Sequence, residues 1–341
     1  MRAARIDESH ELRVVDCEQP TAGPGEVVVR VHAAGVCGTD LHILDGMIKP
    51  DEYPMTLGHE SAGVVEEAGS GVGIAVGTRV ALYNKIHCGV CEQCRNGRQN
   101  ICDREPGQLG FNRDGGDAEY AVIPERSVVA LPDAVDFATA AVLTCAGMTA
   151  VHATRLSRLA LGDTAIVDGI GGVGIMVVQA AASAGARVIA VADSDEKLDL
   201  ARQHGAADGL LVPDAAGYDG LPDRVRAVTD GRGVDVFFEL VGTTRTMTAG
   251  IRSLAKRGRF VSTGYTDESL EIHPIEFILP EASFVSTVAA SVQDLEDAVN
   301  LAAAGHFTVP IAGRFPLEGI HDALGALRER RVVGRQVLEM G

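Results

Sequence analysis

The stretch 165–193 restricts more than any other how this chain can fold. A short apolar strand at 165–168 runs into the glycine-rich turn Gly169–Gly174, an alanine-rich helix follows, and a second apolar strand at 188–192 ends in Asp193. Strand, glycine turn, helix, strand and acid in this order make a βαβ unit, whose two strands are parallel neighbours. The sequence therefore predicts an α/β domain built on a doubly wound parallel sheet.

The glycine turn and the acid together indicate a dinucleotide site. Glycines let the backbone approach a pyrophosphate, and the helix N-terminus presents free N–H groups and a positive dipole. The Asp193 carboxylate stands where it can accept hydrogen bonds from ribose hydroxyls, and it would repel a 2′-phosphate. NAD is therefore favoured over NADP. A tight turn between strand and helix, without a ligand, is the alternative explanation.

A second motif, between Cys88 and Cys102, has the spacing of a metal-binding lobe. Its four thiols are Cys88, Cys91, Cys94 and Cys102, and the residues between them are mostly polar or small. Four thiolates this close can surround one Zn²⁺ tetrahedrally and leave no position for water. The lobe has little apolar core of its own, so the metal would supply its stability. The pattern predicts a structural zinc site, and four unrelated free thiols are the alternative.

Chemically reactive side chains also gather between residues 37 and 60. They are a thiol, two imidazoles, two carboxylates and a hydroxyl: Cys37, Thr39, Asp40, His42, His59 and Glu60. These groups could form a metal site with a proton path. Alternatively, Cys37 is a small buried hydrophobe and the histidines are core or surface residues. Cys145, which stands directly before an expected small-residue turn, is either a further zinc ligand or a buried core residue.

The whole chain limits the remaining possibilities. Two domains are expected from its 341 residues. The formal charge of −17 argues against binding nucleic acid or anionic membranes. The N-terminus lacks the apolar core of a signal peptide and no apolar run approaches membrane-spanning length, so a cytoplasmic protein is expected. Seven cysteines in that reducing compartment are expected to serve as metal ligands or in catalysis rather than in disulfides.

Short β-branched segments between glycines precede the βαβ unit, and alternating strands and helices follow it. The first group predicts an antiparallel, barrel-like domain, and the second continues the parallel sheet. Strands are expected at 26–32, 58–69, 76–83, within 115–131, at 234–240, at 259–263 and at 335–338, with helices at 195–203, 246–255, 295–304 and 321–331. Val241 and Gly264, which follow two of these strands, are expected to line the cofactor crevice.

With these motifs in this order, the chain resembles the zinc-dependent medium-chain alcohol dehydrogenases over essentially its whole length. The resemblance is carried by Gly35–His42, Gly58–Glu60, Cys88–Cys102, Cys145–Gly147, Gly169–Gly174 and Gly334–Arg335. It implies a discontinuous GroES-like β-barrel catalytic domain and a Rossmann cofactor domain. The expected segments are a catalytic domain at 1–148 with a zinc lobe at 84–104, an NAD-binding domain at 149–285, and a return segment at 286–341 that completes the cofactor sheet and the catalytic domain.

The resemblance implies that three residues hold a catalytic zinc ion. The family pattern places these ligands at Cys37, His59 and Cys145, with Glu60 beside the metal and able to replace its water. Asp40 would orient the zinc-binding histidine. Together with the four-thiol lobe, this makes two zinc ions per chain, one catalytic and one structural.

The resemblance further implies a proton relay and a set of cofactor contacts. Thr39 and His42 would carry the proton toward solvent, and imidazole suits this task because it titrates near neutral pH. The residues expected to bind NAD are Thr149, Gly169, Gly171, Gly172, Val173, Gly174, Asp193, Lys197, Val241, Gly264, Val288 and Arg335. Among them, Arg335 would reach the pyrophosphate, and Thr149 and Val288 would lie at the nicotinamide.

The chain departs from the family in two places. Near the last cofactor strand the family often has Gly-Ser and a following Gly, whereas this chain has Ser286-Thr287 and Ala290, so the family's backbone contacts are not carried over to these positions. Where the family often places an aromatic residue over the substrate, this chain reads Leu82-Tyr83-Asn84, and it contains no Trp. We expect Asn84 to face the substrate pocket.

Several functions remain open at this point. The resemblance implies interconversion of an alcohol and its aldehyde or ketone with NAD. A polyol, amino-alcohol, cyclic-alcohol or hydroxyacyl-thioester dehydrogenase on the same scaffold is the alternative, and Asn84 favours a substrate with a second polar group. A non-catalytic NAD-binding zinc protein is the alternative from another class, against which the potential zinc ligands and the relay histidine argue. The family also implies a homotetramer or a homodimer.

Overall fold

The computed structural model describes residues 1–341 and divides the chain into two compact units. The first unit comprises Met1–Met148 and Ala290–Gly341, and the second comprises Thr149–Ala289. The first unit is therefore discontinuous in sequence, because the C-terminal segment packs with the N-terminal strands.

β-Strands dominate the first unit. They are β1 (Arg2–Ile6), β2 (Leu12–Asp16), β3 (Glu26–Val36), β4 (Met55–Thr56), β5 (Ser61–Ala68), β6 (Arg79–Leu82), β7 (Lys85–Ile86), β8 (Gly107–Gln108), β9 (Tyr120–Pro124), β10 (Val128–Ala130), β17 (Ile311–Pro316) and β18 (Arg335–Glu339). One sheet has the order β2-β1-β4, and a larger one has the order β10-β6-β5-β3-β18-β17 with β9 paired to β3. Every pair in them is antiparallel except β17 with β18. The expected antiparallel β-domain is confirmed.

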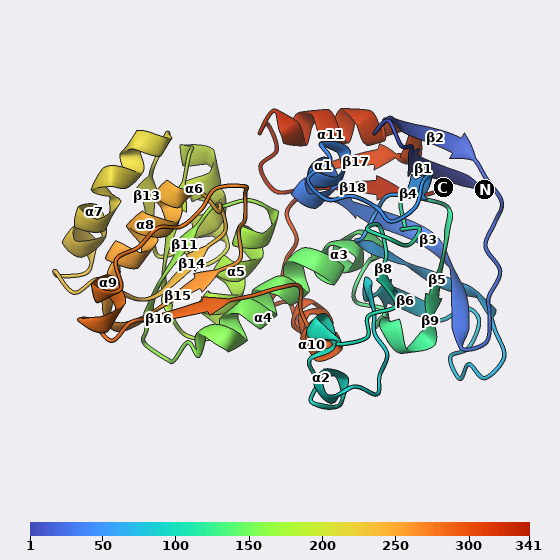
Figure 1. Ribbon diagram of the computed structural model, residues 1–341, viewed down its shortest axis with the longest axis horizontal. Helices are drawn as coiled ribbons and strands as arrows, with labels where there is room; N and C mark the ends of the chain where they lie inside the picture. The colour runs from blue at the N-terminus through green and yellow to red at the C-terminus, as the bar shows by residue number, and fades with distance from the viewer. The chain divides into compact units, whose positions relative to one another are not determined.

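Strand β3 is the central element of this unit and leads directly to the first reactive cluster. It pairs with β5, β9 and β18, and its valines are almost completely buried, as expected for a β-branched run covered on both sides. Its partner β18 comes from the far end of the chain, and Figure 1 shows β17 and β18, in red, beside β3, in blue. Because β3 ends at Val36, Cys37 stands just past a rigid strand end.

The helices of the first unit are short. They are α1 (Gly38–Leu44), α2 (Glu92–Arg95), α3 (Phe137–Val142), α10 (Val292–Ala303) and α11 (Ile320–Arg328). The small-residue turn expected after Cys145 is wrong. Residues Leu143–Gly147 instead form a π-helical turn that joins α3 to α4 (Met148–Ser157), because the segment contains neither a proline nor a residue with positive φ that would end a helix.

The helix formed by these segments, Phe137–Ser157, is the one helix of the chain that is long and apolar enough to cross a membrane. However, 72% of its apolar window is buried inside the protein, which is typical of a core helix.

The second unit is built on a six-stranded parallel sheet of order β13-β12-β11-β14-β15-β16. The strands are β11 (Thr164–Asp168), β12 (Arg187–Ala192), β13 (Asp208–Leu211), β14 (Val234–Glu239), β15 (Leu254–Ser262) and β16 (Ser283–Ser286). The helices are α5 (Gly172–Ser183), α6 (Asp195–Gln203), α7 (Leu221–Val228), α8 (Thr244–Arg252) and α9 (Ile275–Ile278), with a 3₁₀ helix, η4 (Ala215–Gly220). The predicted doubly wound parallel sheet is confirmed.

The strand order fixes where this sheet can bind a ligand. From β11 the chain proceeds to β12 and β13 on one side, and then returns to β14, β15 and β16 on the other. Ligands of open α/β sheets bind at the carboxyl ends of the strands, where the strand order reverses. In this sheet that point lies between β11 and β14, directly beside the glycine turn.

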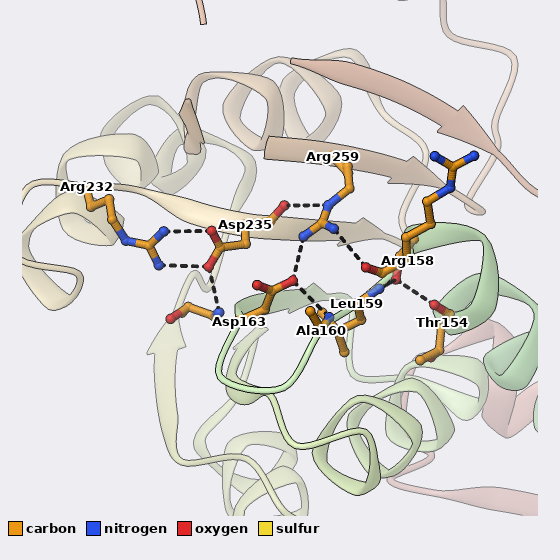
Figure 2. A network of polar contacts seen from close by, with 10 residues as sticks. Thr154, Arg158, Leu159, Ala160, Asp163, Arg232, Asp235 and Arg259 are labelled. Atoms are coloured by element: carbon orange, nitrogen blue, oxygen red, sulfur yellow. Dashed lines mark hydrogen bonds and ion pairs between the residues drawn. The ribbon is translucent and has the colours of Figure 1, made fainter. Parts of the chain in front are cut away.

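The opposite edge of the sheet is closed by a polar network, shown in Figure 2. Asp235 accepts two hydrogen bonds from Arg232, at 2.6 and 2.7 Å, and a third from the backbone N–H of Thr164 at 2.8 Å. Arg259 joins this group to Asp163 through a hydrogen bond of 2.6 Å. These residues come from the amino ends of the strands and from the loops before them. The network therefore stabilises the sheet and leaves its carboxyl edge for a ligand.

Candidate functional site

The first reactive cluster begins at the junction of β3 and α1. The Asp40 carboxylate accepts a hydrogen bond from the backbone N–H of Cys37 at 2.8 Å and a second from Nδ1 of His59 at 3.1 Å. All three residues are buried. Asp40 thus fixes the start of the helix and the orientation of the imidazole at the same time. With Nδ1 engaged, the other ring nitrogen of His59 is available as a ligand.

Four side chains converge at this point although they are distant in sequence. The ligand atoms of Cys37, His59, Glu60 and Cys145 all lie within 4.8 Å of one another. Nε2 of His59 and Oε1 of Glu60 are buried and have no hydrogen-bond partner, and they lie 3.8 Å apart. Buried polar atoms are nearly always paired, so these atoms call for a ligand. Two sulfurs, an imidazole and a carboxylate fit a zinc ion.

The titratable side chains of the cluster shift one another's pKa. The hydrogen bond with Cys145 lowers the pKa of Cys37 well below its usual value, and the same contact, with burial, raises the pKa of Cys145. Burial would lower the pKa of His59, but Asp40 and Cys37 together raise it well above its usual value. These shifts favour an ionised Cys37 beside a protonated His59. A metal cation bound between them would favour the ionised form of both thiols.

Glu60 has a hydrogen-bond partner that the sequence analysis did not assign to it. The guanidinium of Arg335 donates a hydrogen bond to Oε2 of Glu60, and both side chains are buried. Burial raises the pKa of Glu60 to about 7 against the opposing charge of Arg335. A Cβ at Gly35 would lie 2.1 Å from Oε2 of Glu60, so only glycine leaves room for this carboxylate. Contact of Arg335 with a cofactor stays a prediction.

The two residues of the expected relay lie on α1. Thr39 and His42 are three positions apart and therefore share one helix face. The Thr39 hydroxyl lies 3.7 Å from Sγ of Cys37, and Nδ1 of His42 lies 3.1 Å from Sδ of Met47 near the surface. The helix thus places a hydroxyl beside the cluster and an imidazole farther out.

Asn84 lies against the backbone of a potential zinc ligand. Its Nδ2 donates to the carbonyl oxygen of His59 at 3.1 Å, while its Oδ1 is buried without a partner. The preceding residue, Tyr83, is fully buried and donates its hydroxyl to the carbonyl of Ala290 at 2.6 Å. Asn84 is therefore held beside the cluster, and its part in a substrate pocket stays a prediction.

The four-thiol lobe has the geometry of a closed zinc site. The ligand atoms of Cys88, Cys91, Cys94 and Cys102 lie within 4.8 Å of one another, and none forms a disulfide. Two Sγ–Sγ distances are 3.9 and 3.8 Å, and a tetrahedron with Zn–S bonds of ~2.3 Å has edges of about 3.8 Å. Backbone N–H groups of Val90 and Cys91 lower the pKa of Cys88 to about 6, which favours the thiolate.

The second unit brings most of the expected cofactor residues to the carboxyl edge of its sheet. The turn after β11 begins at Gly169, whose φ is +96°. Asp193, Val241 and Gly264 directly or closely follow β12, β14 and β15. Lys197 does not stand free, because its Nζ donates to both carboxylate oxygens of Asp193 at 2.8 and 3.0 Å. The structure thus collects these residues around the switch point.

The rest of the glycine turn lies at the same edge of the sheet, and two expected cofactor residues lie elsewhere in the second unit. Gly171, Gly172, Val173 and Gly174 form the start of α5. Thr149 lies in the first turn of α4, and Val288 follows β16 in an exposed segment. Contacts of these residues with NAD stay predictions.

Sequence reasoning missed three buried acids. Asp168 and Glu239 are fully buried at the ends of β11 and β14, and Asp117 is buried beside Leu57 and Gly58. Burial raises the pKa of all three carboxyl groups. A signal was present for Asp168 and Glu239, because each is an acid at the end of a strand, directly after at least two apolar residues.

Known protein families share this architecture. Residues 23–133 match the family described as "Alcohol dehydrogenase GroES-like domain", and residues 172–304 match the family described as "Zinc-binding dehydrogenase". An alcohol dehydrogenase of Geobacillus stearothermophilus is 34% identical over 350 residues, which cover 100% of both chains. A NAD-dependent alcohol dehydrogenase of Sulfurisphaera tokodaii is 33% identical over 350 residues, which cover 99% of both.

A solved structure agrees with these sequence matches. The crystal structure of the alcohol dehydrogenase from Aeropyrum pernix is similar with a TM-score of 0.91 at 35% identity, covering 99% of this chain and 100% of that one. A GroES-like unit with two zinc-type ligand clusters, continued in sequence by a doubly wound parallel sheet, defines the class of medium-chain dehydrogenases. Within this class the chain belongs to the zinc-containing alcohol dehydrogenase family of oxidoreductases.

Proposed function

We propose that this protein is an NAD-dependent enzyme that interconverts an alcohol and its aldehyde or ketone by hydride transfer. The observation that carries the proposal is the buried convergence of Cys37, His59, Glu60 and Cys145 in the first unit, with a ring nitrogen and a carboxylate oxygen left without partners. This donor set fits a catalytic zinc ion, whereas the four-thiol lobe is closed and fits a structural one.

Each residue of the cluster has a separate task in this proposal. Bound zinc supplies a Lewis acid for the alcohol oxygen, and bound NAD supplies the hydride acceptor. Cys37, His59 and Cys145 hold the metal, and Asp40 keeps Nε2 of His59 aimed at it. Glu60 stands as a fourth potential ligand whose charge Arg335 compensates.

The proton of the alcohol leaves along α1 in this proposal. The Thr39 hydroxyl accepts it next to the cluster, and His42 passes it to solvent from the same helix face. A hydroxyl can accept one proton while donating its own, and an imidazole can exchange protons with water near neutral pH. The two residues act in sequence in this proposal, with Thr39 next to the cluster and His42 nearer the surface.

The second unit binds the dinucleotide in this proposal, with NAD favoured over NADP. Support comes from the glycine turn at the switch point and from Asp193 at the end of β12. Lys197 neutralises part of the charge of Asp193, yet the carboxylate remains able to accept hydrogen bonds from ribose hydroxyls. Relatives named as NAD-dependent alcohol dehydrogenases agree with this preference.

A second candidate keeps the reaction and changes the substrate. Oδ1 of Asn84 is a buried acceptor without a partner beside His59. A polyol or an amino alcohol has a further polar hydrogen that such an acceptor could bind. Cyclic alcohols and hydroxyacyl thioesters are further candidate substrates that no contact in the structure favours.

We also propose that the protein forms a homo-oligomer. Four large apolar side chains are at least 45% exposed on α9, just after it and on β16, the edge strand of the parallel sheet: Ile275, Ile278, Leu279 and Phe284. Exposed apolar residues at a sheet edge are typical of an interface. Light scattering should give the mass of a dimer or a tetramer. The mass of a monomer at all protein concentrations would contradict the proposed homo-oligomer.

The test of the function is a panel of primary, secondary, cyclic, polyhydroxy and amino alcohols with NAD and NADP, and of carbonyl compounds with the reduced cofactors, on zinc-loaded protein. We expect turnover with NAD and two zinc ions per chain. Cys145→Ser should lose one zinc ion and nearly all turnover. Cys17→Ser, which changes a thiol outside both clusters, is the matched control and should keep both. Turnover that survives in Cys145→Ser would refute the assignment of the catalytic metal.

A further inference from the structure

Two carboxyl groups lie side by side at the switch point of the parallel sheet. Asp168 and Glu239 are the last residues of β11 and β14, and they are direct partners in the parallel register. Both are fully buried. Side chains of paired residues in neighbouring strands point to the same face of the sheet, so the two acids share one environment.

The hydrogen bonds of the pair leave one oxygen of each acid unpaired. Oδ1 of Asp168 accepts a hydrogen bond from the Tyr218 hydroxyl at 2.8 Å. Oε1 of Glu239 accepts three, from the backbone N–H groups of Val241 and Gly242 and from the Thr246 hydroxyl. Oδ2 of Asp168 and Oε2 of Glu239 are buried without a partner. Two ionised carboxylates in this state would repel each other and lack solvation.

One proton resolves this conflict, and the contacts decide which acid carries it. Glu239 has three donors on one oxygen, which suits a carboxylate that holds the turn after β14 in place. Asp168 has a single donor, Tyr218, and therefore gains least from being ionised.

We propose that Asp168 carries a proton in the folded protein, and that this neutral carboxyl group keeps negative charge away from the pyrophosphate of the dinucleotide. Asp168 is then a positioning residue that Tyr218 holds in place. The inference rests on the proposed function in one respect, since it takes the second unit to bind a dinucleotide.

The charge of Asp168 acts on the place where an anion would bind. Asp168 directly precedes Gly169, and the glycine turn leads into α5, whose N-terminal N–H groups and positive dipole are the attractive elements for an anion. A buried negative charge at this place would oppose both of them with little screening from water. Dinucleotide affinity should therefore weaken when Asp168 ionises.

The groups around Asp168 also favour its protonated form. Burial raises the pKa of Asp168 to about 8, Tyr218 opposes this with its hydrogen bond, and Glu239 adds to it. These two groups, from η4 and β14, are the titratable groups that act on Asp168. Asp193, at the end of β12, acts on Tyr218 and is paired with Lys197. Asp168 is thus mostly neutral at pH 7 and mostly ionised by pH 9.

The experiment measures the NADH dissociation constant of zinc-loaded protein by fluorescence between pH 6.5 and pH 9.5. For the wild type we expect a constant affinity at low pH and a loss of about tenfold as pH rises through about 8. Asp168→Asn, which cannot ionise, should bind equally well at every pH. Tyr218→Phe removes the hydrogen bond that favours the carboxylate, so its midpoint should move to higher pH. Asp208→Asn, at the amino end of β13, is the matched control and should follow the wild type.

A second measurement tests the proton without any ligand. An acid with a raised pKa in the folded state stabilises the fold at low pH, and this stability is lost as pH rises from the unfolded pKa to the folded one. The midpoint of thermal unfolding should therefore fall less steeply with pH in Asp168→Asn than in the wild type. Identical slopes, or equal pH dependence of NADH binding in the two proteins, would overturn the inference. A wild type that binds no NADH at any pH would instead refute the proposed function.

Discussion

Two glycines of the same turn should affect different properties when each is replaced by alanine: Gly174 the stability of the fold, and Gly171 the affinity for NADH. A Cβ at Gly174, in the first turn of α5, would lie 2.0 Å from the carbonyl oxygen of Gly169. A Cβ at Gly171 would meet nothing within 4 Å, and the φ of −106° there suits any residue. Gly174 is therefore required by the packing of the protein itself, whereas Gly171 leaves a space that the proposed pyrophosphate would use.

The size of each effect follows from these contacts. In Gly174→Ala, α5 or the turn must move by about 1 Å, since carbon and oxygen atoms approach to ~3.2 Å at the closest, and such overpacking costs about 1–3 kcal/mol. The backbone oxygen cannot move aside easily, so we take the upper value, from which alanine's better helix propensity removes ~1 kcal/mol. The remaining ~2 kcal/mol should lower the melting temperature by roughly 4–8 °C. Gly171→Ala should change stability by less than ~0.5 kcal/mol.

The assay combines thermal unfolding with NADH titration on the zinc-loaded variants. Gly171→Ala should keep the wild-type melting temperature and lose at least about tenfold in NADH affinity, because its methyl group blocks the approach of a pyrophosphate to the N–H groups of α5. Gly174→Ala should lose stability first. A Gly174→Ala protein as stable as the wild type, or a Gly171→Ala protein that binds NADH normally, would refute this reasoning.

Three further predictions concern single residues. Cys94→Ser removes one ligand from the four-thiol lobe, which has little apolar core. Metal analysis should then show one zinc ion fewer, and the melting temperature should fall. A wild type with only one zinc ion would contradict the interpretation with two zinc sites. Asp193→Gly removes the acid at the end of β12 and should narrow the preference for NAD over NADP, and an unchanged ratio of kcat/KM values would count against Asp193. Burial raises the pKa of Asp117. The free energy of unfolding of the wild type should therefore fall by up to ~1.4 kcal/mol per pH unit above the unfolded pKa of ~3.9, and Asp117→Asn should lack this slope in urea unfolding. Equal slopes in the two proteins would show that Asp117 is ionised in the folded state.

The fold could be predicted from the sequence because its signals are local. The glycine turn after an apolar strand, the helix behind it and the acid after the next strand occur within residues 165–193 and specify a βαβ unit without distant contacts. The four-thiol lobe is equally local, since its ligands lie between Cys88 and Cys102. The π-helical turn at Leu143–Gly147 was missed, because small residues of that kind are as compatible with a turn as with a wide helical one.

Contacts between distant segments were predicted only where the family resemblance supplied them. The convergence of Cys145 with Cys37 and His59 is of this kind. The hydrogen bond between Arg335 and Glu60 joins residues 275 positions apart and depends on the pairing of β18 with β3. No periodicity or spacing in the sequence encodes that pairing. The sequence analysis therefore assigned Arg335 only to cofactor binding.

Buried atoms without partners separate the two candidate sites by chemistry. In the Cys37 cluster of the first unit they are a ring nitrogen and a carboxylate oxygen beside two sulfurs, and this mixed donor set fits a zinc ion. At the carboxyl ends of β11 and β14 in the second unit they are oxygens of Asp168 and Glu239, next to the positive end of α5, which disfavours a metal cation. A proton on Asp168 removes the repulsion between the two acids. The same defect, an unpaired buried acceptor, therefore indicates a zinc ion in one unit and a protonated carboxyl group in the other.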